Sequence, residues 1–167
     1  MILGMSTAAF TTLHVVISLL GIFSGLVVVL GMRRGARLPS WTALFLVTTI
    51  LTSATGFLFH SASFGPPHVI GVISLVILAV ALVALYGQHL AGGTRWVYVA
   101  AAMLALYLNV FVGVIQAFQK SAFLHALAPT QQSAPFIVAQ LLVLGCFVGV
   151  RVGALRHFPA RTVRAVV

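Results

Sequence analysis

The chain has 167 residues, 62% of them hydrophobic, and it contains nine Lys and Arg residues but no Asp or Glu. The missing carboxylates exclude the usual designs of proton pumps and sodium-coupled transporters, which rely on an Asp or Glu within the membrane. The sequence also lacks a Ser-His-acid set, an HExxH zinc motif and a phosphate-binding loop, so an enzyme is the least favoured class.

Five apolar segments are long enough to cross a bilayer as helices, since a hydrocarbon core about 30 Å thick requires roughly 20 residues. In chain order they are Ala9–Leu30, Trp41–Phe59, Val69–His89, Trp96–Phe118 and Phe136–Leu155. Stretches such as Val72–Leu85 are apolar on every side, which is typical of helices in lipid. The connections are short, so the sequence predicts one all-α domain over residues 1–167, a polytopic transmembrane bundle of five spans.

The first two segments carry matching stripes of small and polar residues. On the first, His14 and Ser18 are followed by Gly21 and Gly25. The second segment has such a residue at every fourth position: Thr48, Thr52, Gly56 and His60. Small residues let two helix backbones approach closely, so we expect the stripes to face each other and to direct His14 and His60 inward.

Basic residues between the segments predict the orientation, because Lys and Arg in short loops stay on the cytoplasmic side. With five spans, all eight arginines fall on one side of the membrane: Arg33, Arg34, Arg37, Arg95, Arg151, Arg156, Arg161 and Arg164. Lys120 falls on the other side, together with the uncharged connection 61–67. Trp41 and Trp96 open helices on the arginine side, where indole rings favour the headgroup level. The sequence therefore predicts an outer N-terminus and an inner C-terminus.

Four of the six histidines fall near the outer face in this arrangement: His14, His60, His68 and His125. Imidazole is a ligand for Zn, Cu, Fe and haem iron. The sequence therefore predicts one outer site for a haem b or for a Cu, Zn or Fe ion. The alternative is that these histidines lie at the headgroup level and bond to water or lipid.

The last two segments add amides and glycines. Asn109 and Gln116 share a face of the fourth segment, and Gln140 lies on the fifth. Such amides hold helices together, or with Thr48 and Thr52 they line a path for a polar substrate.

Three further glycines are spaced by four residues on the fifth segment: Gly145, Gly149 and Gly153. A ridge of this kind permits close helix contact, either within the chain or with another chain.

Several stretches resemble a known family: ALYGQHLAG at 84–92, LYLNVFV at 106–112, QAFQK at 116–120 and LAPTQ at 127–131. Together they are similar to a family of small multi-pass inner-membrane proteins of proteobacteria, for which no activity is established. The resemblance covers most of the chain. It implies a bacterial origin and an inner-membrane location, and it implies nothing about mechanism.

Three functional hypotheses follow. The first is a non-catalytic subunit or binding protein of a larger membrane assembly, either a homo-oligomer or a complex with other chains. The alternative is a haem- or metal-binding electron carrier that uses the outer histidines, and the third is a pore for small neutral solutes. Nucleic acid is excluded as a partner, because the arginines adjoin helix ends, where anionic lipid headgroups attract them.

Overall fold

A computed structural model describes residues 1–59 and 64–157; at 152, 153 and 155–157 it describes the helix but not the side chains. The long elements in these residues are helices: α1 (Thr7–Arg33), α2 (Pro39–Gly56), α3 (Pro66–Leu82), η1 (Val83–Gly87), α4 (Thr94–Lys120), α5 (Ala122–Leu127) and α6 (Ala134–His157). The prediction of an all-α fold is confirmed for this part of the chain, and η1 is a π-helical turn that continues α3.

Four of the helical segments are long and apolar enough to cross a membrane: Thr7–Arg33, Pro66–Gly87, Thr94–Lys120 and Ala134–Arg151. Helix α2 is not among them. It has 18 residues and is rich in threonine, which lowers its hydropathy. Several of its hydroxyls are satisfied within the helix, however; those of Thr48 and Thr49 donate to the carbonyls of Leu44 and Phe45, each at 2.7 Å.

Local signals in the sequence start the helices. Ser6 caps α1, where its side chain accepts a hydrogen bond of 3.2 Å from the Ala9 amide. Pro39 and Pro66 occupy the first positions of α2 and α3, where the missing N–H costs nothing. Gly35 has a φ of 70° in the turn between α1 and α2, a conformation that favours glycine.

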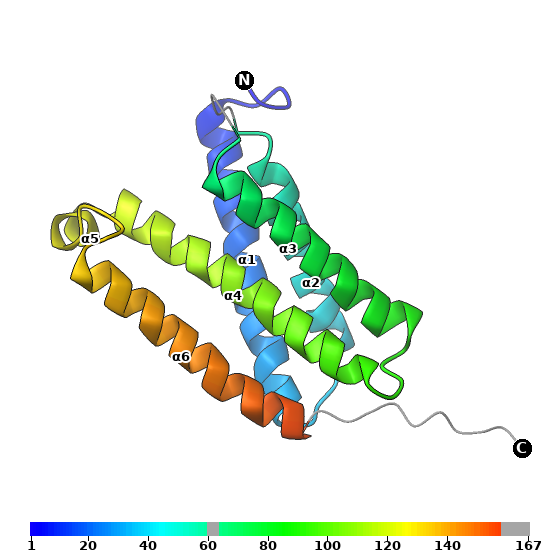
Figure 1. Cartoon of the computed structure of the whole chain (residues 1–167). Coiled ribbons are helices and arrows are strands. Elements are labelled where there is room, and N and C mark those ends of the chain that lie inside the picture. The colour runs from blue at the N-terminus through cyan, green and yellow to red at the C-terminus, as the bar shows by residue number, and fades with distance from the viewer. Residues whose placement is uncertain (60–63, 158–167) are drawn as a thin grey trace, which may run out of the picture.

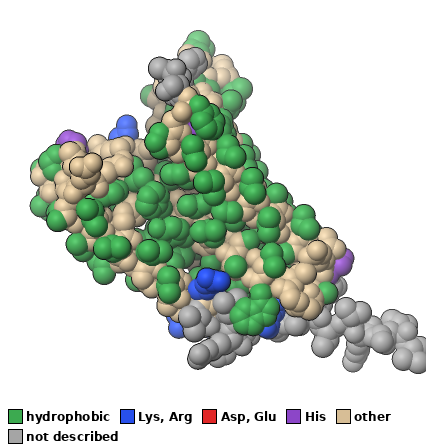
Figure 2. All heavy atoms as spheres, viewed as in Figure 1, with side chains coloured by type: hydrophobic (Ala, Val, Ile, Leu, Met, Phe, Trp, Pro, Cys, Tyr) green, Lys and Arg blue, Asp and Glu red, His purple; other side chains and the backbone are tan. Residues whose placement is uncertain are grey.

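The connections gather at two ends of the bundle. Figure 1 shows the α1–α2 connection, the α3–α4 connection and the last turns of α6 at one end. We call this the arginine end, because it carries the described arginines Arg33, Arg34, Arg37, Arg95 and Arg151. The start of α1 and the α2–α3 connection lie at the other end, the amino end, and α5 forms a separate corner with the adjoining ends of α4 and α6 (Figure 1). Along the helices the visible surface is largely apolar, and basic side chains gather at the arginine end (Figure 2).

The buried core is built mainly by α1 to α4. Phe45 and Leu106 are fully buried in it, and Ala81 and Ala102 are small enough to let α3 and α4 pack closely. Gly25 on α1 faces this core, and a Cβ placed there would lie 2.6 Å from Leu106 Cδ1 and 2.8 Å from the Phe45 ring. The approach of α1 to α2 and α4 therefore depends on the missing side chain at Gly25.

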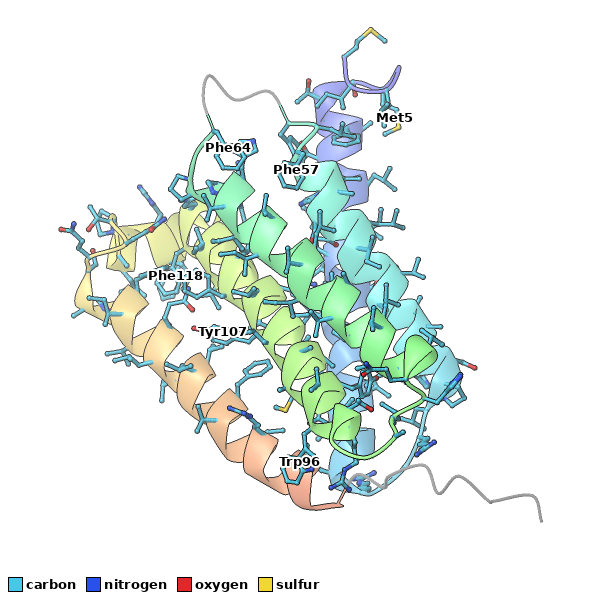
Figure 3. The ribbon with its side chains drawn as sticks, turned by 45° about the vertical axis from the view of Figure 1, so that its right-hand side comes forward. Met5, Phe57, Phe64, Trp96, Tyr107 and Phe118 are labelled. Carbon is cyan, nitrogen blue, oxygen red and sulfur yellow. The ribbon has the colours of Figure 1, made fainter. Side chains whose placement is uncertain are left out.

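Helix α6 packs against this core from one side only. Phe147 meets Tyr107 of α4 with ring centroids 5.6 Å apart, and Phe136 meets Phe118 at 5.5 Å. Tyr107 and Phe118 lie on the part of α4 that adjoins α6 (Figure 3). The opposite face of α6 is exposed.

We predict that Gly25→Ala destabilises the bundle, because the new methyl group overlaps two core side chains that have no room to move. An overpacked core costs about 1–3 kcal/mol. Gly113→Ala on α4 is the matched control, since a Cβ there meets only Ile22 Cδ1, at an ordinary contact distance of 3.4 Å, and both changes raise helix propensity equally. Thermal unfolding in detergent, followed by circular dichroism, measures both variants. Equal melting temperatures for the two would contradict the packing at Gly25.

Candidate functional site

His14 joins α1 to α2 at the amino end. Its Nδ1 lies 2.7 Å from Thr55 Oγ1, and its ring meets the Phe59 ring edge-on with centroids 5.1 Å apart. The Phe10 ring also packs against the Phe59 ring, with centroids 5.1 Å apart. A Cβ at Gly56 would lie 4.0 Å from His14 Cε1. The stripes of α1 and α2 therefore face each other here, and His14 is half-buried between the two helices.

The Thr55 hydroxyl bears on which nitrogen of His14 carries the proton. That hydroxyl lies 2.7 Å from both the Leu51 carbonyl and His14 Nδ1, and its single hydrogen can serve only one of them. Where it donates to Leu51, Nδ1–H of His14 donates to Thr55 Oγ1. In this tautomer Nε2 carries a lone pair, which can accept a hydrogen bond or bind a metal ion.

His68 closes the start of α3. Its Nδ1 accepts a hydrogen bond of 3.2 Å from the Gly65 amide, which caps the helix. Its ring lies 5.2 Å from the Phe64 ring in a stacked arrangement and 5.7 Å from the Phe57 ring. Phe57 and Phe64 both lie at the amino end (Figure 3). The His68 side chain thus caps α3 and packs against two phenylalanine rings beside the α2–α3 connection.

The other predicted ligands are not brought together in the described residues. His60 lies outside them. His125 is exposed on α5, at the separate corner, where it lines a small cavity of about 50 Å³ with Phe118 and Phe136. The described part of the chain contains no group of three or more His or Cys side chains that could hold a metal ion. The predicted haem b or metal site therefore stays a prediction, to which His14 offers one nitrogen.

A second set of polar groups meets in the middle of the bundle, around Gly21. A Cβ at Gly21 would lie 3.0 Å from Asn109 Nδ2, 3.2 Å from Thr49 Oγ1 and 3.3 Å from Thr48 Oγ1. Asn109 Nδ2 and Thr52 Oγ1 are enclosed and have no hydrogen-bond partner among the described residues. Both are the kind of group that holds helices together in lipid.

The predicted polar lining of five side chains is distributed over several places. Thr48 and Asn109 lie in the contact of α1, α2 and α4. Thr52 lies one turn further along α2, with an enclosed hydroxyl. Gln140 lies between α4 and α6, where its Nε2 donates to the Phe111 carbonyl at 3.2 Å. Gln116 is exposed near the end of α4. A path through the bundle would need these groups in line, and the structure brings together only Thr48 and Asn109.

The glycines divide into two groups. Gly21 and Gly25 face other helices at close range, as described above. Gly145 and Gly149 have no atom within 4 Å of a Cβ built on them, so the ridge on α6 faces away from the bundle. Gly153 continues this spacing on α6, and its surroundings lie outside the described side chains.

The arginine end holds a larger cavity that the sequence analysis missed. It has a volume of about 270 Å³ and lies between α1, the start of α2, η1 and the start of α4, with Arg37, Tyr86 and His89 among its lining residues. The predicted topology already put Arg37 and His89 on one side of the membrane. It gave no reason to pair them, because apolar spans do not show which helices are neighbours.

No protein-family model, curated protein or solved structure matches this chain. The resemblance to the proteobacterial family stays a prediction, and function is argued from the chain's own residues.

We predict that His14 and Thr55 stabilise the fold as a pair. His14→Ala and Thr55→Val should each lower the free energy of unfolding by about 1 kcal/mol, the usual contribution of one hydrogen bond. The double variant should be little worse than either single one, because the same bond is lost. Unfolding in detergent by heat or denaturant measures the cycle. Fully additive losses would show that the two side chains do not interact.

Proposed function

We propose that this chain is a non-catalytic subunit of a membrane assembly, which docks onto another membrane helix through the outward face of α6. The observation that carries the proposal is the open glycine ridge, Gly145 and Gly149. Lipid tails are as apolar as leucine, so helices associate in membranes through close packing rather than through hydrophobic contact. An open ridge of small residues offers a second helix such a close approach.

The ridge lies within a continuous apolar face. Leu141, Leu142 and Val148 flank the two glycines and are 60%, 65% and 57% exposed. These five residues recur at the three- and four-residue spacing that keeps side chains on one face of a helix. We call them the α6 ridge face. The five residues carry no charge, and the first charged residue along α6 is Arg151, at the arginine end.

The comparison within the molecule supports this assignment. On α1, both glycines at the same spacing are covered by side chains of α2 and α4. On α6 the same device has no neighbour in the described residues. The partner that fits is another apolar helix, from a second copy of the chain or from a different subunit.

We further propose five spans, with the N-terminus outside and the C-terminus inside, in the bacterial inner membrane. The location rests on the family resemblance. The five spans rest on α2, which runs from the arginine end to the amino end beside α1 (Figure 1). Its 18 residues extend about 27 Å, close to the hydrocarbon thickness of about 30 Å. The orientation rests on the arginines, which favour the cytoplasmic side.

Single-cysteine labelling tests the topology in a Cys146→Ser background. A membrane-impermeant maleimide applied to intact cells should label Phe64→Cys, and Leu3→Cys as the matched outer control. Ala36→Cys should react only after permeabilisation, because it lies in the arginine-rich connection. Labelling of positions 36 and 64 from the same side would mean that α2 does not cross the membrane. Labelling of position 36 alone in intact cells would mean that the orientation is the reverse of the one proposed.

Cross-linking through the α6 ridge face tests the docking. In the Cys146→Ser background, Leu142→Cys lies on that face, so a second copy docked there should give a disulfide-linked dimer when membranes are oxidised. A different partner should instead appear as a larger complex in mild detergent, without that dimer. Gly149→Leu should abolish either species, because a large side chain prevents close approach.

The control is Leu144→Ala, which changes an exposed side chain on another side of α6 and should leave the assembly intact. A monomeric mass for the unmodified protein, or an assembly that Gly149→Leu does not affect, would refute docking through α6.

A further inference from the structure

The cavity at the arginine end has the composition of a binding site. Its volume of about 270 Å³ is close to the lower limit of small-molecule sites, about 300 Å³. It lies where three chain segments meet: the α1–α2 connection, η1 with the residues that follow it, and the first turn of α4. None of the groups discussed for α6 or for His14 contributes to it.

The inner wall is apolar. Val28 of α1 and Leu90, which follows η1, are buried there, and Leu85 adds a half-buried side chain. Val28 lies four residues before Met32 on α1, so the cavity extends about 6 Å along the helix from its last turn. This part can accommodate hydrocarbon.

The outer rim is polar and basic. Arg37, Tyr86 and His89 are exposed around it. The sequence has no acidic side chain, so no Asp or Glu of this chain offsets the guanidinium charge. Deeper in, Tyr98 is hydrogen-bonded to Thr42, and both are buried. The polarity thus falls from the rim inward.

The backbone of the wall is unusual. Val83–Gly87 forms a π-helical turn, a feature that is frequent at functional sites. His89 and Leu90 follow it with φ values of 50° and 61°, which residues other than glycine rarely adopt. Leu90 is nevertheless buried and its amide bonds to the Ala84 carbonyl at 3.1 Å, so the surrounding packing holds this conformation in place.

Two tryptophans set the depth of the cavity in the membrane. Trp41 lies just before Thr42 on α2, and Trp96 lies two residues before Tyr98 on α4. Arg95 stacks over the Trp96 ring, with its guanidinium carbon 5.1 Å from the ring centroid. Indole rings and arginines favour the headgroup level, so the polar rim lies where lipid phosphates lie and the apolar wall lies where acyl chains begin.

We propose that this cavity binds one anionic phospholipid, with its phosphate on Arg37 and the first part of one acyl chain against Val28, Leu85 and Leu90. A basic pocket between membrane helices suits such a headgroup. A guanidinium binds phosphate oxygens through charge-assisted hydrogen bonds, and the Tyr86 hydroxyl and His89 can add neutral ones. The site is independent of the α6 ridge face.

Titration of the purified chain in neutral detergent tests the site. The probes are dihexanoyl phosphatidic acid, dihexanoyl phosphatidylcholine and inorganic phosphate. Trp41 and Trp96 are the two tryptophans of the chain; Trp41 adjoins the lining residue Thr42 and Trp96 lies two residues from the lining residue Tyr98, so their fluorescence reports binding. We expect saturable binding of phosphatidic acid, and binding of the choline lipid weaker by about tenfold or more, because its headgroup is neutral overall.

Two variants and one control locate the site. Arg37→Gln should weaken phosphatidic acid binding by about tenfold or more, and Ala36→Phe should do so by filling the cavity while Arg37 stays. Arg34→Gln removes an arginine of the same connection that does not line the cavity, and it should change the affinity by less than about twofold. Melting curves show that each variant is folded.

Three results would overturn the proposal. Equal affinity for the choline lipid would show that the site does not select an anionic headgroup. Equal affinity for inorganic phosphate would show that the acyl chain does not contribute to binding and that the cavity is a simple anion site. Equal losses in Arg34→Gln and Arg37→Gln would show attraction by overall charge rather than a defined cavity.

Discussion

A bundle without one acidic side chain must satisfy its buried polar groups without ion pairs. In this chain the backbone carbonyls take that role. Ser24, Thr48, Thr49 and Thr55 each donate to a carbonyl one turn earlier, and Gln140 donates to the Phe111 carbonyl of the neighbouring helix. In lipid an unsatisfied polar group costs several kcal/mol, so this arrangement is what allows a threonine-rich helix such as α2 to lie inside the bundle.

The same constraint separates the two kinds of site. Where polar groups meet in the interior, as around Gly21, they are neutral and close-packed. Charge is confined to the helix ends, and the arginine end combines it with a cavity. The amino end instead offers aromatic rings and imidazoles, of which His14 and His68 are already engaged by Thr55 and by the Gly65 amide. A ligand with negative charge therefore finds its complement at the arginine end.

The sequence predicted the helices well because long apolar segments have few other structures available in a chain of this composition. The contact of the first two helices could also be predicted, since Gly21 and Gly25 recur on one face. Lateral neighbours could not be predicted. Nothing in the spacing shows that Arg37 meets the residues around His89, because those positions are joined only through the packing of η1 and α4. The π-helical turn likewise has no sequence signal in Val83–Gly87.

His68 shows a different reason for a missed role. It was predicted as a ligand from its position near one membrane face, while its place three residues after Gly65 makes it a helix cap. The capping interpretation needed only local sequence. The ligand interpretation needed His60, which lies outside the described residues, and His125, which lies on α5 at a separate corner.

The one-sided packing of α6 divides the molecule into two tiers of stability. Core residues of α1 to α4 surround one another, whereas α6 contributes only its inner side chains, such as Phe147 and Ala154, to the shared interior. Separation of α6 would break those contacts and leave the remaining helices joined. We therefore expect α6 to open locally at a lower free energy than global unfolding.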